Sequence, residues 1–333
     1  MFKRLRRNRK SPSIRALLQE TSLSPADLVA PLFVTEGENL KEKIPKLPGI
    51  FRYSLDQLIS VATQYHALGI QAIALFPHID PALRNEEASE AYHPSGLIPR
   101  TLATLKRELP SLTLISDIAL DPYTSHGHDG VLDATGWVDN DMTVDILVKQ
   151  ALSHAVAGAD IVAPSDMMDG RIQCIREALD ANGFPHVSIL SYTAKYASSL
   201  YAPFREAINT KLSFGDKKSY QMDPSNAREA LLEAAADEAE GADMLLVKPA
   251  LPYLDIISKL RASTHLPIGA YHVSGEYAMV MAAQEMGMLD AHAVFYEQAL
   301  SIKRAGADFI FTYAIDSLLE TMSSRLTSYQ IQH

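Results

Sequence analysis

The sequence predicts a closed barrel of eight parallel β-strands surrounded by helices, a (β/α)8 or TIM barrel, with an extended N-terminal arm. Eight short apolar runs with the composition of buried strands recur along the chain. Most are separated by stretches of helical periodicity, and neither a glycine-rich dinucleotide fingerprint nor a P-loop is present. Eight strand and helix units in about 300 residues favour a closed barrel over an open, doubly wound sheet.

The expected strands are continuous apolar runs, which is typical of strands that are covered on both faces. They comprise residues 28–34, 72–76, 112–120, 160–163, 187–192, 244–247, 268–273 and 309–313. The clearest helical stretches are residues 55–68, 144–157, 227–240 and 291–303. Joints such as AGADIVAP and AGADFIFT place a glycine between a helix and the following strand. Glycine is the preferred residue just after a helix C-terminus, so these joints support the alternation.

The first ten residues differ in charge from the rest of the chain. They carry six basic side chains and no acidic one, whereas the whole chain of 333 residues has a net charge of −10. A basic arm can bind nucleic acid, target an organelle or contact a neighbouring subunit. The acidic body would repel the phosphates of a nucleic acid, and the arm lacks the apolar segment of a targeting signal. We therefore expect a subunit contact. Residues 1–25 are the predicted arm, which includes a short helix at 11–21, and residues 26–333 are the predicted catalytic barrel.

Composition limits the partners and the compartment. The chain is 47% hydrophobic and 21% charged, and no run approaches the roughly 18 apolar residues that a membrane helix needs. We therefore expect neither a membrane nor a nucleic acid as a partner. The single cysteine, Cys174, excludes an internal disulfide framework and suits a reducing cytoplasm, which is the expected location.

Two lysines at strand ends carry the predicted chemistry. Lys248 follows the apolar run MLLV, and the alternation of side chains along a strand points it the same way as Leu246. Burial lowers the pKa of a lysine, and a neutral amine attacks carbonyl carbon. Lys195 ends the preceding strand, and neighbouring strands are about 4.8 Å apart, so the two charges would repel. The alternative is a lysine that extends into solvent.

A long segment follows Lys195. About thirty residues without clear periodicity separate it from the helix that begins near Ser225, and they include Arg205, Lys217 and Gln221. Loops of more than about 15 residues in a compact domain are usually lids or disordered. A basic lid over a pair of lysines would capture a carboxylate. The alternative is a solvated basic loop.

Together these segments resemble porphobilinogen synthase, also called 5-aminolevulinate dehydratase, across essentially the whole chain. The matching stretches are DIALDPYTSHGHDG, SYTAKYASSLYAPFREA, FGDKKSYQMDPSNAREAL, DMLLVKPALPYLDI, YHVSGEYAM and RAGADFIFTY. The resemblance implies a lyase of tetrapyrrole (haem) biosynthesis that condenses two molecules of 5-aminolevulinate into porphobilinogen and releases two waters. It also implies self-association, commonly as an allosteric homooctamer in which the arm wraps around a neighbour.

The resemblance also assigns roles to the lysines. It implies that Lys248 forms a Schiff base with the keto carbon of one substrate molecule. Lys195 either forms a second imine or tunes Lys248 by its charge, and the sequence leaves both readings open.

Two sets of residues are implied as clamps for the substrate carboxylates. Ser274 and Tyr313 would hold the carboxylate of the molecule bound through Lys248. The lid residues Arg205, Lys217 and Gln221 would hold the other. Many relatives have arginine at position 217, and a lysine offers a point charge rather than a two-pronged fork.

Metal use follows from the loop after the third strand. Zinc-dependent relatives have three cysteines there, whereas this chain has Ala119, Asp121 and Asp129. Zinc is therefore not expected, and carboxylates prefer hard ions such as Mg²⁺. Asp121 and Asp129 are expected to polarise the substrate amine, directly or with a weakly held ion, and an acidic solvent turn is the alternative.

A second metal site is implied by the resemblance alone. It would be a regulatory Mg²⁺ site at Glu233. Without the resemblance, the sequence around Glu233 indicates only a solvated helix face. The chain is thus assigned to the aspartate-rich, non-zinc, magnesium-responsive type of the family, with no organic cofactor.

Two other functions remain open. A class I aldolase would explain Lys248 but not paired lysines with two carboxylate clamps. An inactive scaffold would explain only the fold and the arm.

Overall fold

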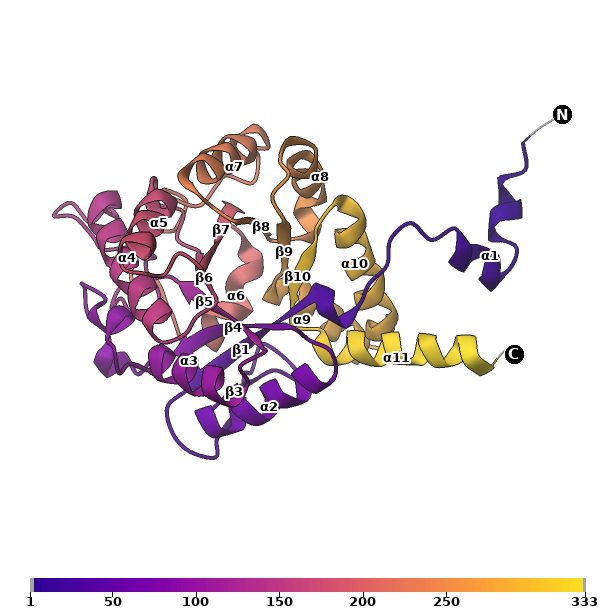
Figure 1. The fold of residues 1–333 in the computed structure, drawn as a ribbon, viewed down its shortest axis with the longest axis horizontal. Coiled ribbons are helices and arrows are strands. Elements are labelled where there is room, and N and C mark those ends of the chain that lie inside the picture. Colours follow the sequence, from indigo (N-terminus) through magenta and orange to yellow (C-terminus); the bar gives the residue numbers. More distant parts are fainter. Residues whose placement is uncertain (1–2, 332–333) are drawn as a thin grey trace.

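The structure, a computed structural model, describes residues 3–331, and a closed barrel of parallel strands forms its centre (Figure 1). The barrel strands are β1 (Leu28–Thr35), β4 (Ala72–His78), β5 (Thr113–Ile118), β6 (Ile161–Pro164), β7 (Ser188–Lys195), β8 (Met244–Lys248), β9 (Ile268–His272) and β10 (Phe309–Thr312). Neighbours in this order pair in parallel, and β1 pairs with β10 to close the ring. The predicted (β/α)8 barrel is confirmed, and each of the eight expected strands is present.

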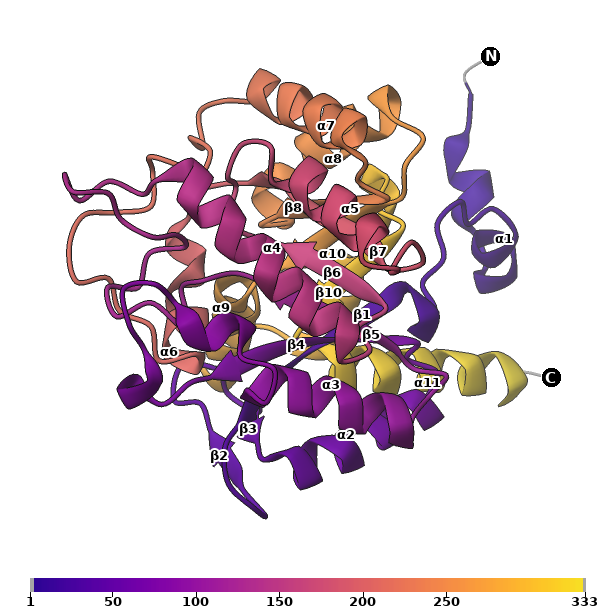
Figure 2. The same cartoon turned by 60° about the vertical axis from the view of Figure 1, so that its left-hand side comes forward.

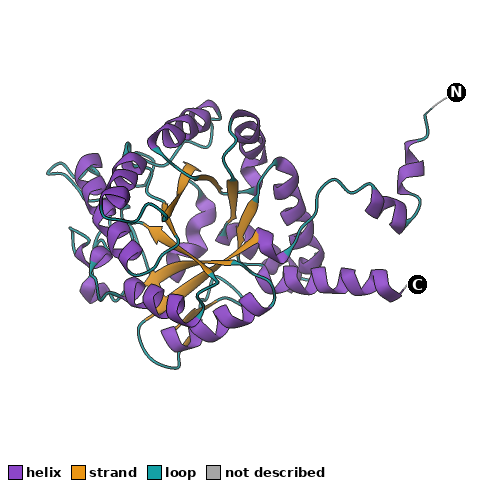
Figure 3. Cartoon of the chain, viewed as in Figure 1, coloured by secondary structure: helices purple, strands orange, loops and turns teal. Residues whose placement is uncertain are grey.

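Helices cover the outside of the barrel (Figure 3). They are α2 (Leu55–Ala67), α3 (Leu97–Glu108), α4 (Asn140–Val156), α5 (Arg171–Ala181), α7 (Arg228–Glu240), α8 (Leu254–Ser263), α9 (Ser274–Glu285), α10 (Ala291–Ala305) and α11 (Ile315–Ile331). The short helix α6 (Ala202–Ala207) lies instead at the barrel mouth, where Phe204 faces Lys248. The four stretches that we expected to be helical correspond to α2, α4, α7 and α10. Across residues 3–331, no helix has both the length and the apolar character that crossing a membrane requires.

Local packing explains why a glycine sits inside β9. A Cβ atom at Gly269 would lie 2.6 Å from Leu246 Cδ1 and even closer to the ring of Phe309. A larger side chain would displace the side chains of Leu246 and Phe309, and close-packed interiors absorb such a displacement poorly. Gly269 therefore leaves room for Leu246 of β8, the strand that ends at Lys248.

Two segments differ from the sequence-based expectation. A short antiparallel pair, β2 (Lys41–Lys43) with β3 (Phe51–Tyr53), extends the sheet beside β1. The segment after Lys195, expected to lack periodicity, contains a 3₁₀ turn (Ser199–Tyr201) and α6. Elements of three and six residues are too short to show a helical repeat, which is why the pattern missed them.

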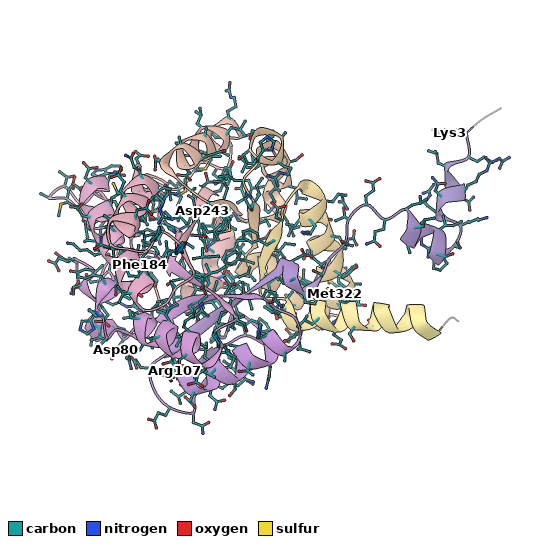
Figure 4. The ribbon with its side chains drawn as sticks, viewed as in Figure 1. Lys3, Asp80, Arg107, Phe184, Asp243 and Met322 are labelled. Carbon is teal, nitrogen blue, oxygen red and sulfur yellow. The ribbon has the colours of Figure 1, made fainter. Side chains whose placement is uncertain are left out.

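The N-terminal arm extends from the barrel (Figure 2). No side chain between residues 3 and 27 is buried, and Lys3 stands well apart from the barrel side chains in Figure 4. Its helix α1 (Pro12–Leu17) is shorter than the predicted 11–21. The 3₁₀ turn η2 (Pro25–Asp27) then leads into β1, and the backbone N–H of Ser24 donates to Asp27 Oδ2 at 2.7 Å.

A buried ionic cluster joins the elements beneath one side of the barrel mouth. The guanidinium of Arg171 at the start of α5 lies 3.5 Å from Asp166 Oδ2 and 3.6 Å from Asp237 Oδ1 of α7. The Ser191 hydroxyl of β7 donates to Asp237 Oδ2 at 2.6 Å and accepts from Arg171 at 3.2 Å. The three charged side chains are at most 3% exposed. The cluster therefore fixes β7 relative to α5 and α7.

Replacing Asp237 tests this cluster. Asp237→Ala leaves the Arg171 charge buried with one partner fewer, and we expect it to lower the free energy of unfolding by about 3 kcal/mol. Urea denaturation monitored by circular dichroism measures the change. Asp180→Ala is the matched control, because Asp180 pairs with Arg176 on the surface at 55% exposure, where the loss should be below about 1 kcal/mol. Equal losses in the two variants would show that the buried cluster contributes no more to stability than a surface ion pair.

Candidate active site

Lys195 and Lys248 are direct neighbours at the carboxyl ends of β7 and β8. Their Cα positions are partners in the parallel register, and each residue is only 6% exposed. The sheet therefore brings together the two lysines that the sequence predicted to meet. In barrels of this class, the carboxyl ends of the strands carry the reactive groups.

Aromatic rings surround the amine of Lys248. Its Nζ lies 4.5 Å from the ring centre of Tyr271, 5.1 Å from those of Tyr192 and Phe204, and 5.3 Å from that of Tyr201. Burial, followed by the positive charge of Lys195, lowers the pKa of Lys248 to about 7. A large share of Lys248 is therefore uncharged near neutral pH, as a carbonyl nucleophile must be.

Lys195 has polar partners instead of rings. Its ammonium donates to the backbone carbonyl of Ser165 and lies 3.4 Å from Asp129 Oδ2. Burial would raise the pKa of Asp129, but the charges of Lys195 and Lys217 outweigh it and hold that pKa well below its usual range. Asp129 is thus a permanent carboxylate on the Lys195 side of the site.

The lid reaches the same carboxylates. Lys217 Nζ lies 2.6 Å from Asp129 Oδ1 and 3.0 Å from Asp121 Oδ2, and Gln221 Nε2 donates to Asp129 Oδ2 at 3.4 Å. Burial would lower the pKa of Lys217, but the two carboxylates raise it, so this ammonium stays charged. The segment expected to be a lid is therefore fastened over the barrel mouth by buried ionic contacts.

Ser274 and Tyr313 lie on the opposite side, around Lys248. Ser274 is the first residue of α9, and its hydroxyl accepts the backbone N–H of Phe204 at 3.0 Å. Tyr313 follows β10, and its hydroxyl hydrogen bonds to that of Tyr271 at 2.9 Å. Phe204 and Tyr271 are both rings that face Lys248. The structure thus places Ser274 and Tyr313 on the Lys248 side, and Lys217 and Gln221 on the Lys195 side.

Arg205 lies in α6, between these two groups. It is half-buried, and no hydrogen bond or ion pair engages its guanidinium within residues 3–331. Its charge lowers the pKa of Tyr201 and of Tyr220, opposing the burial that raises both. The guanidinium of Arg205 is therefore available to bind an anion.

Asp117 is a group that the sequence reasoning did not single out. It lies near the end of β5, and its Oδ1 is buried without a hydrogen-bonding partner among the described residues. Burial raises its pKa to about 7, opposed by the charges of Lys248 and Lys195. An acid with this pKa can exchange protons near neutral pH. A carboxylate inside an apolar strand was the available signal, since such a residue has no place in a plain core.

Glu233 lies outside the barrel mouth, beside the lid. It lines a cavity of about 460 Å³ together with Asp169, Glu229 and lid residues from Lys218 to Asp223. Burial raises the pKa of Glu233, and so do the negative charges of Asp237, Asp169 and Glu229, while Arg171 lowers it. Within residues 3–331, no group of three or more His, Cys, Asp or Glu side chains is arranged to hold a metal ion.

Comparison with known proteins identifies the family. The model of the delta-aminolevulinic acid dehydratase family matches residues 2–321, nearly the full length of the chain. The chain belongs to this family. Delta-aminolevulinic acid dehydratases are also called porphobilinogen synthases, so the resemblance noted from sequence motifs is confirmed.

Individual delta-aminolevulinic acid dehydratases support the assignment. The chain is 54% identical to a chloroplastic enzyme from Oryza sativa over 94% of this chain and 74% of that protein. It is 52% identical to the enzyme from Chlamydia pneumoniae over 97% of both. The Toxoplasma gondii enzyme, whose crystal structure contains the product porphobilinogen, superposes with a TM-score of 0.96 at 48% identity and covers 99% of this chain and 94% of its own.

The activity follows from the delta-aminolevulinic acid dehydratase family. The chain is a lyase with porphobilinogen synthase activity, which joins two molecules of 5-aminolevulinate into porphobilinogen in porphyrin biosynthesis. The aldolase and scaffold alternatives are set aside, because the family match extends over nearly the whole chain.

The lowered pKa of Lys248 gives a testable pH dependence. About one tenth of this amine is neutral near pH 6 and about nine tenths near pH 8, so imine formation should accelerate with an inflection at about pH 7. Borohydride trapping of 5-aminolevulinate on Lys248 at several pH values measures the rate.

Removing the neighbouring charge should move that inflection. Lys195→Gln should shift it to higher pH, yet leave it below the usual lysine value of about 10.4, because burial remains the larger cause. Lys259→Gln, which removes a surface lysine at 46% exposure, should leave it unchanged. An inflection that stays the same in Lys195→Gln would show that Lys195 does not tune Lys248.

Proposed function

We propose that the chain makes porphobilinogen through an imine between Lys248 and the keto carbon of one 5-aminolevulinate molecule. The main support is the pairing of Lys248 with Lys195 on adjacent strands, where burial and like charge keep one amine neutral. Attack of that amine on the ketone, with loss of water, gives an imine whose adjacent carbon is more acidic than that of the ketone. Asp117, with a pKa of about 7 that the charge of Lys248 lowers, is the candidate for moving the proton.

The two carboxylate clamps are proposed to serve two different substrate molecules. Ser274 contacts the backbone of Phe204 and Tyr313 contacts the hydroxyl of Tyr271, two residues whose rings face Lys248, so we assign both clamp residues to the molecule bound there. Arg205, Lys217 and Gln221 are assigned to the second molecule, because the last two contact Asp129 beside Lys195. Whether Lys195 also forms an imine stays open.

An exchange of ionic partners is proposed for the second site. Lys217 occupies both Asp121 and Asp129 in the substrate-free chain. The ammonium of 5-aminolevulinate would replace Lys217 on these carboxylates, and the released Lys217 would bind the substrate carboxylate. Each charge keeps a partner throughout, which avoids the large cost of a buried unpaired charge.

The same pair bears on the metal question. Asp121 and Asp129 already hold a buried ammonium, so an ion there would have to displace Lys217. We therefore propose that the pair acts directly on the substrate amine. The absence of thiolates in this loop supports the non-zinc, aspartate-rich type. An ion at these two residues stays a prediction.

A regulatory Mg²⁺ is proposed at Glu233. Mg²⁺ keeps several of its waters and needs only one or two carboxylates. Glu233 and Asp169 line the same cavity and supply hard oxygen ligands, which fits such an ion. The cavity is also lined by lid residues next to Lys217, so occupancy could influence lid closure. The homooctamer, the allosteric behaviour, the cytoplasmic location and the role of residues 1–25 in subunit contacts stay predictions.

Peptide mapping tests the imine. Borohydride added with 5-aminolevulinate should fix the substrate to the peptide that contains Lys248. Lys248→Ala should lower turnover by at least about a thousandfold, because a lost nucleophile removes the covalent route. Lys259→Ala serves as the surface control. A label on neither Lys248 nor Lys195 would reject the proposed mechanism.

Metal readdition tests the proposed type. After chelation, Mg²⁺ should raise both activity and the melting temperature, because an ion that binds the folded state stabilises it. Zn²⁺ should not substitute. Glu233→Gln should abolish the Mg²⁺-dependent rise in melting temperature, and Glu285→Gln, which alters an exposed carboxylate, should retain it. Recovery with Zn²⁺ alone would contradict the argument from the aspartate loop.

A further inference from the structure

Glu276 is a buried carboxylate that the proposed mechanism does not use. It lies in the first turn of α9 and is 1% exposed. Its Oε1 accepts the backbone N–H of Leu251 at 2.6 Å, and its Oε2 accepts that of Val273 at 2.5 Å. Burial raises the pKa of Glu276 to about 7 against the pull of these N–H groups. Placing such a group here is costly, so it calls for a reason.

The two N–H groups belong to segments that carry proposed site residues. Leu251 lies three residues after Lys248, in the turn that follows β8. Val273 immediately precedes Ser274, at the start of α9. One carboxylate therefore connects the end of the strand that carries Lys248 to the helix that carries Ser274.

Helix capping alone does not account for this arrangement. A glutamate at the third helical position needs only the contact with the residue before the helix, here Val273. The second oxygen instead reaches a different element, the turn after β8. Glutamine could not replace it, because its amide group has one oxygen and its NH₂ would face a backbone N–H donor.

The start of α9 is fixed on another side as well. A Cβ at Gly275 would lie 2.6 Å from the carbonyl oxygen of Leu200, so α9 packs directly on the backbone that precedes α6. The Ser274 hydroxyl also donates to that carbonyl, at 3.2 Å. Figures 1 and 2 both show α9 beside α6. With these contacts in place, the bond to Leu251 sets the remaining distance, from α9 to β8.

We propose that Glu276 is a positioning residue for the reaction, which holds Lys248 and Ser274 at the spacing of one substrate molecule. A 5-aminolevulinate bound through its keto carbon to Lys248 must place its carboxylate at Ser274 at the same time. Misplacement of reacting groups by about 1 Å can slow a reaction about a hundredfold. This inference rests on the proposed roles of Lys248 and Ser274.

Single-turnover trapping tests the inference on the full-length enzyme. The rate constant and the amplitude of borohydride-trapped imine on Lys248 are measured at saturating 5-aminolevulinate. Glu276→Gln should lower the rate constant at least tenfold and leave most of the amplitude. Glu276→Asp keeps the charge but is one methylene shorter, and it should give a smaller decrease. Glu285→Gln makes the same chemical change at the exposed end of α9 and should match the wild type.

The outcomes separate the possibilities. If Glu276 has a purely structural role, its variants lose folded protein, so the amplitude of trapped imine falls. The rate constant of the protein that stays folded would then remain within twofold of wild type, and this result would overturn the inference. If the wild type forms no imine on Lys248, the proposed mechanism fails instead. If both Glu276 variants fail to fold, amide hydrogen exchange on the wild type tests whether Glu276 connects the two segments. Protected amides at Leu251 and Val273 support the connection, and rapid exchange at either one overturns it.

Discussion

The site depends on burying two lysine amines side by side while giving them unequal partners. Lys195 is surrounded by oxygen atoms, including the carboxylate of Asp129, whereas Lys248 is surrounded by aromatic rings. Oxygen partners stabilise a positive charge, and a desolvated position next to another cation does not. The barrel register sets this asymmetry, because Lys195 and Lys248 are partners on neighbouring strands that end in different surroundings.

That asymmetry extends into the loops. The carboxylates gather on the Lys195 side, where Lys217 from the lid joins Asp121 and Asp129. The rings and hydroxyl groups gather around Lys248. One half of the mouth therefore suits ionic exchange, and the other half suits a neutral nucleophile. A single barrel can handle two copies of the same substrate differently, because each half meets it with different chemistry.

The sequence predicted much of the fold and the pairing of Lys195 with Lys248. Strand periodicity gives the direction of a side chain, and strand order gives its neighbour, so this contact needed only short-range patterns. The contact between Lys217 and Asp129 spans 88 residues. Periodicity predicts only local structure and not a contact between residues so far apart in the sequence. The roles of Lys217 and Gln221 therefore came only from the family resemblance.

Other features could not be predicted from the sequence, because their roles depend on tertiary packing. Glu276 reads as an ordinary helix residue until the turn after β8 is seen to donate to it. Helix α6 is too short for a repeat to reveal. Asp117 lies within one of the motifs that carried the family resemblance, but only the closed barrel shows that the charges of both lysines act on it.

The exposed arm carries a consequence for subunit biology. Leu23 packs against the core and Asp27 pairs with Lys303 at 3.1 Å. Because residues 3–22 contribute no buried side chain to their own barrel, a truncated chain that starts at residue 23 would keep its core intact. Any fall in turnover after that deletion would then measure the contribution of the arm to a neighbouring subunit. Mixing truncated with intact chains would reveal whether the arm of one chain restores the activity of another.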